Sequence, residues 1–156
     1  MKNIKKKIRE AVEKQSVENE VVKAAMMEYC RIASEKGEDS KETLDAKVGL
    51  AFAYIRNGKL EDGISLMNEI YERKCELFGK LAPSSVRTFC AKAQLCDTDD
   101  FDSCFEVLKE ASDQIDQIID TEDWDVMSAL HNYAYASERF YGSPALEVYL
   151  TMCEWV

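Results

Sequence analysis

The chain has 156 residues, an apolar fraction of 46% and a formal net charge of −10. This length supports one domain with a sizeable core and is too short for two large domains. The acidic balance disfavours nucleic acid as a partner, because an acidic body repels a phosphate backbone, and no apolar run approaches the roughly 20 residues of a membrane span, so we expect no membrane partner.

The first fourteen residues are basic, unlike the rest of the chain. They contain six Lys or Arg and two Asp or Glu, a net charge of +4 (6 − 2), which leaves −14 (−10 − 4) for the remainder. No apolar segment follows this basic start, so we expect no secretory signal peptide and a cytoplasmic location. The six cysteines form no C-x-x-C pair, and we expect them to be reduced, small apolar residues. A metal or disulfide role is the alternative.

Apolar spacing predicts helices along the whole chain. A basic amphipathic helix is expected over residues 2–14, and Ser16 is expected to cap a second helix that ends at Gly37. Asp39 then caps a third helix, with Glu42 completing a capping box, and Asn57-Gly58 ends it. A fourth helix, starting with Leu60, reaches Gly79.

The second half continues in the same way. Pro83 opens a helix that includes Cys96, and the polar turn 97–100 leads into another over residues 101–118. The segment 121–123 caps a helix that includes Ala134, and Ser143-Pro144 opens the last one. No useful β-alternating segment is present, so the prediction is an all-α chain of about eight helices with antiparallel neighbours.

An internal period of about 42 residues relates parts of the chain. Gly37 and Gly79 are each followed by a polar helix start and an apolar residue, and Ala51 and Ala93 lie seven residues beyond. A third copy, slightly closer, has Val126-Met127 and then Ala134. Such a period is typical of one helical unit stacked on itself, which directs attention to a surface more than to an active site.

Residues 50–63 resemble the tetratricopeptide repeat pattern of small, aromatic and turn residues, with Ala51, Tyr54, Gly58, Leu60 and Gly63 at its positions. The longer period, with starts at Gly37 and Gly79, is similar to the kinesin-light-chain-type variant. The resemblance implies a right-handed superhelical stack of antiparallel helical hairpins, an α-solenoid. The predicted single repeat domain comprises N-terminal helices (1–36), repeat 1 (37–79), repeat 2 (80–120) and a partial repeat 3 (121–156).

The small residues of the pattern have a packing role. Ala51 and Gly63 are expected to let the two helices of a hairpin approach closely, while Tyr54, Leu60 and Met67 fill the layer between units. The second and third units depart from the pattern in their turns. Other helical-hairpin repeats, such as those of bacterial peptide-pheromone receptors, have similar patterns.

The repeat register places a concave groove on the first helix of each hairpin. We expect this groove to bind a peptide or protein segment without catalysis; the alternative is a regulatory receptor for a small signalling peptide or metabolite. The predicted groove residues are Asp45, Val48, Phe52 and Ile55 in the first unit, Arg87, Cys90, Gln94 and Asp97 in the second, and Ser128, His131, Tyr135 and Glu138 in the third.

Several kinds of chemistry have no support in the sequence. His131 is the only histidine, and its helix offers Ser128 and Asn132 but no nucleophile–base–orienter set. There is no phosphate-binding glycine motif, and the acidic turn at 97–102 lacks the glycine and terminal glutamate of a calcium loop. We therefore expect no enzymatic activity, no cofactor and no metal.

The C-terminal helix is expected to end the stack without a polar cap. Leu146, Tyr149, Leu150 and Trp155 then form an exposed apolar patch. This predicts a homodimer through the C-terminal helix, or a fragment of a longer repeat protein, in preference to a third hairpin that covers its own aromatic residues.

Overall fold

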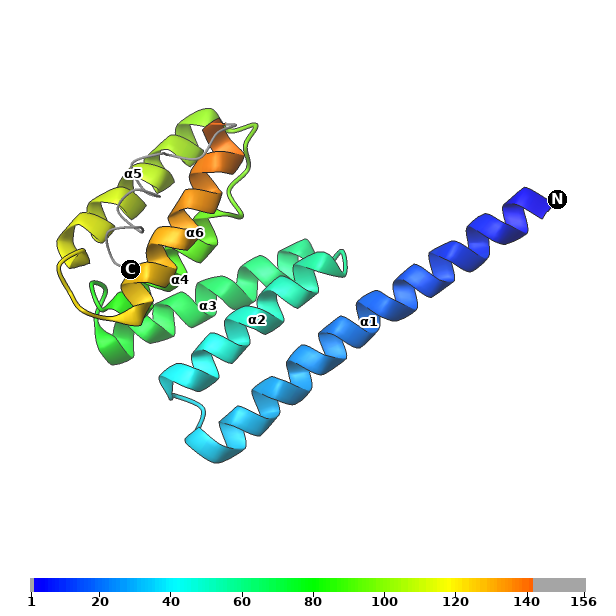
Figure 1. Cartoon of the computed structure of the whole chain (residues 1–156), viewed down its shortest axis with the longest axis horizontal. Coiled ribbons are helices and arrows are strands. Elements are labelled where there is room, and N and C mark those ends of the chain that lie inside the picture. The colour runs from blue at the N-terminus through cyan, green and yellow to red at the C-terminus, as the bar shows by residue number, and fades with distance from the viewer. Residues whose placement is uncertain (1, 142–156) are drawn as a thin grey trace. The chain divides into compact units, whose positions relative to one another are not determined.

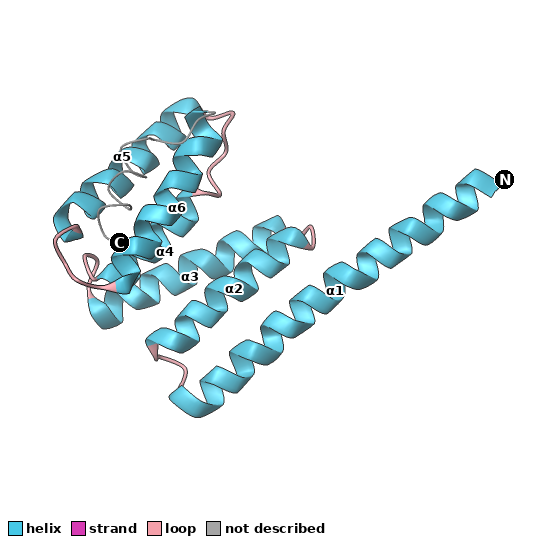
Figure 2. Ribbon diagram, viewed as in Figure 1, coloured by secondary structure: helices cyan, strands magenta, loops and turns pink. Residues whose placement is uncertain are grey.

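The computed structural model describes residues 2–141 of the chain, which are helical and contain no strand within that range (Figure 1, Figure 2). The helices are α1 (Lys2–Lys36), α2 (Lys41–Arg56), α3 (Leu60–Phe78), α4 (Pro83–Ala93), α5 (Phe101–Ile118) and α6 (Trp124–Tyr141). The all-α prediction is confirmed for these residues. The chain divides into two compact units, residues 1–67 and 68–156.

The first unit is built on α1, which is continuous over 35 residues. The prediction of two helices separated at Ser16 is wrong, because a single helix, α1, runs through this position. Serine is only mildly unfavourable inside a helix and caps one only where the backbone leaves helical geometry. Neither glycine nor proline occurs in α1 to force such a break.

A tight turn returns the chain from α1 to α2, and these two helices pack side by side (Figure 1). Gly37 has a φ of 88°, a left-handed conformation that ends α1, as predicted. The predicted capping box is wrong: Ser40 is the N-cap, and its hydroxyl accepts the backbone N–H of Thr43 at 3.1 Å. Asp39 lies one residue too early to occupy that position.

The start of α3 approaches α2 closely, as the small residues predicted. A Cβ atom on Gly63 would lie 2.8 Å from the carbonyl oxygen of Ala51 and would also overlap the side chain of Ile55. Ala51 and Met67 are fully buried. Leu60, by contrast, is 52% exposed, so its predicted role in filling a layer is wrong; as the first residue of α3 it precedes the buried face.

In the second unit, which also contains residues 68–78 of α3, the three helices α4, α5 and α6 pack together, with α4 against both of the others. Its core combines apolar residues of all three helices: Val86, Phe89, Cys90, Ala111, Ile115, Ile118, Val126, Ala129 and Leu130. Pro83 lies in the first turn of α4, as expected, and Asp100, in the predicted polar turn, caps α5. The final predicted helix, from Pro144, lies outside the described residues.

The 42-residue offset is visible in the hydrogen bonds of the two turns. Gly37 N–H donates to the carbonyl of Ala33 at 2.9 Å, and Gly79 N–H donates to that of Cys75 at 3.0 Å. Gly79 also has a positive φ, of 93°. The segments that start α2 and α4 therefore have the same local geometry at equivalent positions. The right-handed superhelix and the repeat boundaries stay predictions.

Candidate functional site

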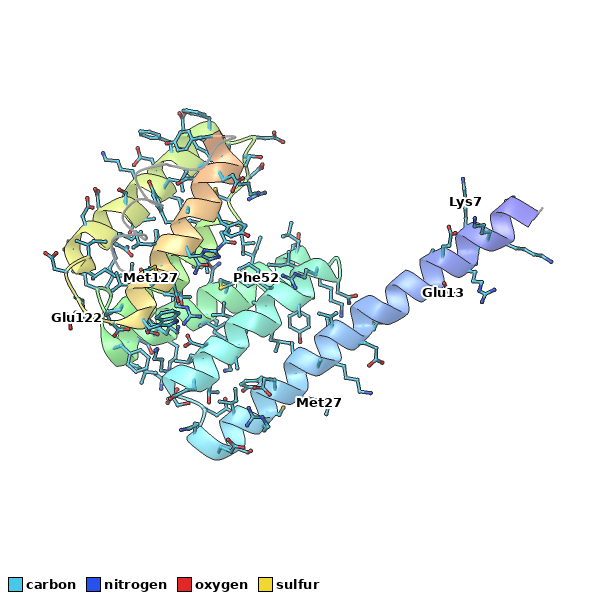
Figure 3. All side chains as sticks on the ribbon, in the orientation of Figure 1. Lys7, Glu13, Met27, Phe52, Glu122 and Met127 are labelled. Carbon is cyan, nitrogen blue, oxygen red and sulfur yellow. The ribbon has the colours of Figure 1, made fainter. Side chains whose placement is uncertain are left out.

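The surface shared by α4 and α6 contains an open hollow of about 320 Å³. Arg87 of α4 lines one side. The remaining lining residues come from α6, the helix on which Figure 3 labels Met127, and they are Trp124, Met127, Ser128, His131 and Asn132. Their spacing of three or four residues places them on one face of α6.

Polar contacts beneath the hollow hold α4 against α6. The guanidinium of Arg87 pairs with the carboxylate of Asp125 at 2.9 Å, and the Asp125 side chain is only 2% exposed. Asn132 Nδ2 donates to the carbonyl of Arg87 at 3.2 Å, and Gln94 Nε2 donates to Asn132 Oδ1 at 3.1 Å. These bonds fix the side chains around the hollow before any ligand arrives.

Aromatic groups form the accessible part of the same surface. Trp124 is 79% exposed, and Tyr135 is 53% exposed. The rings of His131 and Tyr135 meet edge to face, with centroids 4.9 Å apart. Large amphipathic rings that present both an apolar face and a polar edge are typical of recognition surfaces, because they bury much area at little cost in side-chain entropy.

The potentially reactive side chains that line the hollow are those of His131 and Ser128. His131 and Ser128 lie three residues apart on α6, but the nearby carboxylate of Asp125 is buried and paired with Arg87. That carboxylate therefore stabilises the α4–α6 contact. Among the described residues, no group of three or more His, Cys, Asp or Glu side chains could hold a metal ion.

The structure brings together some of the groove residues that were predicted in the second and third repeats, all of which lie in the unit of residues 68–156. Arg87, Ser128 and His131 line the hollow, Tyr135 adjoins it through His131, and Gln94 through Asn132. Glu138 is exposed farther along α6.

Two predicted positions differ in the structure. Cys90 is fully buried in the core and is not a groove residue. Asp97 lies in the turn beyond α4, which ends at Ala93 and not at Cys96 as expected. Arg139 accounts for the earlier end: its guanidinium donates to the carbonyls of Gln94 and Cys96, so these groups need no helical partners.

Sequence reasoning missed Trp124, Met127 and Asn132. The apolar spacing gave no signal for them, because Trp124 precedes Met127 by three residues, a spacing that a buried face of a helix also shows.

The groove residues predicted in the first repeat lie on α2. Asp45, Val48, Phe52 and Ile55 are all half-buried. Figure 3 labels Phe52 on this helix. Phe52 is not fully buried, so its predicted place in a ligand site is not contradicted, and its role stays a prediction.

No protein-family model matches the chain, and no curated protein is significantly similar to it. The tetratricopeptide resemblance therefore rests on the residues quoted for it. Within residues 2–141, no helix has both the length and the apolar character needed to cross a membrane.

Proposed function

We propose that the chain is a non-enzymatic binding module that holds a peptide or a protein segment on the α4–α6 surface. The observation that carries this proposal is that Arg87, Ser128 and His131 share one hollow with the exposed ring of Trp124. An open hollow with an aromatic rim and a fixed polar base suits one apolar side chain of a ligand and the backbone groups beside it.

The negative charge of the second unit indicates which residues flank the bound side chain of the peptide. Residues 68–156 contain 7 Lys or Arg and 18 Asp or Glu, a net charge of −11 (7 − 18). Glu122, labelled in Figure 3, and Glu138 are exposed on the segment that includes α6. Opposite charge speeds association and excludes like-charged partners, so the ligand is an apolar or aromatic residue flanked by Lys or Arg.

The test is a set of short labelled peptides with one central aromatic residue and either basic or acidic flanks, measured by fluorescence polarisation. Basic flanks are expected to bind and acidic flanks are not. Trp124→Ala is expected to weaken binding about tenfold or more, as an anchor residue does. Phe101→Ala is the matched control, because Phe101 is 62% exposed but lies outside the hollow. Equal affinity of the two variants would contradict the proposal.

A second candidate is a receptor for a small metabolite. The volume of about 320 Å³ is in the range of small-molecule sites, but such sites enclose most of their ligand. A ring as exposed as Trp124 cannot enclose one, so the peptide is favoured. Thermal stabilisation by a metabolite library, without binding of any peptide, would reverse this preference.

A further inference from the structure

The turn between α4 and α5 brings two thiols together. Cys96 follows the end of α4, Cys104 lies in the first turn of α5, and their Sγ atoms are 2.7 Å apart. Cys104 is fully buried and Cys96 is half-buried. Both are free thiols in the structure. An S–S bond is about 2 Å long, so a small shift of either side chain would bring the sulfur atoms to bonding distance.

The backbone explains why the two sulfur atoms meet. Cys96 N–H donates to the carbonyl of Ala93 at 3.4 Å, which tightens the chain after α4, and Asp100 N–H donates to the carbonyl of Asp97 at 3.0 Å. Asp100 then caps α5, and the Cys104 thiol lies 3.0 Å from the carbonyl oxygen of Asp97. The turn is therefore closed by its own hydrogen bonds, with the sulfur atoms on its inner side.

The two cysteines have different surroundings. Burial, followed by the contact with Cys96, raises the pKa of the Cys104 thiol to about 12, and Arg139 opposes this rise. Arg139 also donates to the carbonyl of Cys96 at 2.7 Å. A partly exposed thiol meets a dissolved oxidant first, whereas a buried, protonated thiol does not. Cys96 is thus the thiol that a dissolved oxidant reaches first, and Cys104 is the buried thiol in contact with it.

We propose that Cys96 and Cys104 form a reversible intramolecular disulfide when the protein meets a peroxide. The Cys96 thiol ionises and its thiolate attacks one peroxide oxygen. The O–O bond breaks, the departing hydroxide takes up the proton that Cys96 released and becomes water, and Cys96 is left as a sulfenic acid. The Cys104 sulfur then attacks the Cys96 sulfur, and the displaced hydroxide takes the Cys104 proton and leaves as a second water. Two thiols and one hydrogen peroxide give one disulfide and two waters, and a dithiol reductant restores both thiols.

This inference is independent of the proposed function. The test treats the full chain with dilute hydrogen peroxide, blocks the remaining thiols with an alkylating reagent, and maps tryptic peptides. Cleavage after Lys92 and Lys109 releases both cysteines in one peptide, residues 93–109. The expected product is this peptide without alkyl groups and lighter by two hydrogen atoms, and dithiothreitol reverses the change. The oxidised chain is expected to melt roughly 5 °C or more higher than the reduced chain.

Two variants act as controls. Cys30→Ser removes an exposed cysteine in another part of the chain and is expected to leave the cross-linked peptide unchanged. Cys96→Ser, at a half-buried position, is expected to abolish both the cross-link and the thermal shift. If peptide 93–109 of the wild type instead carries sulfinic acid at Cys96 with an alkylated Cys104, or if Cys96 pairs with another cysteine, the proposal is overturned.

Discussion

Replacing glycine by alanine is expected to have opposite effects on stability at Gly63 and Gly49, because α3 approaches α2 closely only at Gly63. Gly63 is buried, and a Cβ atom there would lie 2.8 Å from the carbonyl oxygen of Ala51. Gly49 lies inside α2, is exposed, and would place a Cβ atom in open space. Replacing either glycine by alanine lowers the conformational entropy of the unfolded chain and improves helix propensity, a gain of about 1 kcal/mol.

At Gly63 a second effect opposes this gain. The Ile55 side chain can move, but the Ala51 carbonyl belongs to the backbone of α2, so the helices must separate; overpacking of this kind costs about 1–3 kcal/mol and more when backbone shifts. We therefore expect Gly49→Ala to stabilise the protein by about 1 kcal/mol and Gly63→Ala to destabilise it by about 1–2 kcal/mol. The two variants then differ by about 2–3 kcal/mol.

Urea unfolding followed by far-ultraviolet circular dichroism measures both variants against the wild type. Hydrogen exchange at the amides of α2 and α3 then shows whether the change arises in that hairpin. Equal stabilisation by the two substitutions would refute the reasoning, because it would mean that the helices have room for a methyl group at Gly63.

Three further changes follow from other contacts. Arg87→Met is expected to lower the free energy of unfolding by about 2 kcal/mol in urea titrations, because it removes a partner from the buried Asp125 carboxylate. Burial raises the pKa of the Cys90 thiol to about 12, so the folded state stays protonated where an unfolded thiol ionises; stability falls as pH rises from about 9 to about 12. Cys90→Ala is expected to reduce that fall by about 1.4 kcal/mol between pH 8 and pH 10, measured by urea titration at each pH. Ser40→Ala is expected to cost about 1 kcal/mol through loss of the N-cap, whereas Ser34→Ala, inside α1, is expected to change thermal stability little.

The sequence was most informative where a single residue determines local geometry. Gly37, Gly58 and Gly79 all have positive φ and lie where helices end, as their spacing predicted. Gly63 was predicted to allow close packing, and the structure confirms this. The roles of these residues can be predicted from the sequence because glycine alone combines easy access to positive φ with the absence of a side chain.

Structural features that depend on contacts between residues far apart in the chain could not be predicted from the sequence. The end of α4 depends on Arg139, which lies more than forty residues later. The hollow depends on which face of α6 remains exposed, and apolar spacing alone does not separate an exposed Trp124 from a buried one. The meeting of Cys96 and Cys104 depends on the turn geometry, which the spacing of the cysteines did not indicate.

The uninterrupted length of α1 has a consequence for how its first residues become ordered. Residues 4–11 and Glu13 are exposed, and Figure 3 labels Lys7 and Glu13 on α1. An isolated helix must first form a costly nucleus, but the packed part of α1 already supplies one, so the remaining turns need only propagate from it. The first turn contains no acidic residue, and ion pairs such as Arg9–Glu13 at 3.0 Å contribute only about 0.5 kcal/mol each. The ordered length of α1 is therefore a graded quantity, which salt, temperature or an anion at the helix N-terminus can lengthen or shorten turn by turn without unfolding either unit.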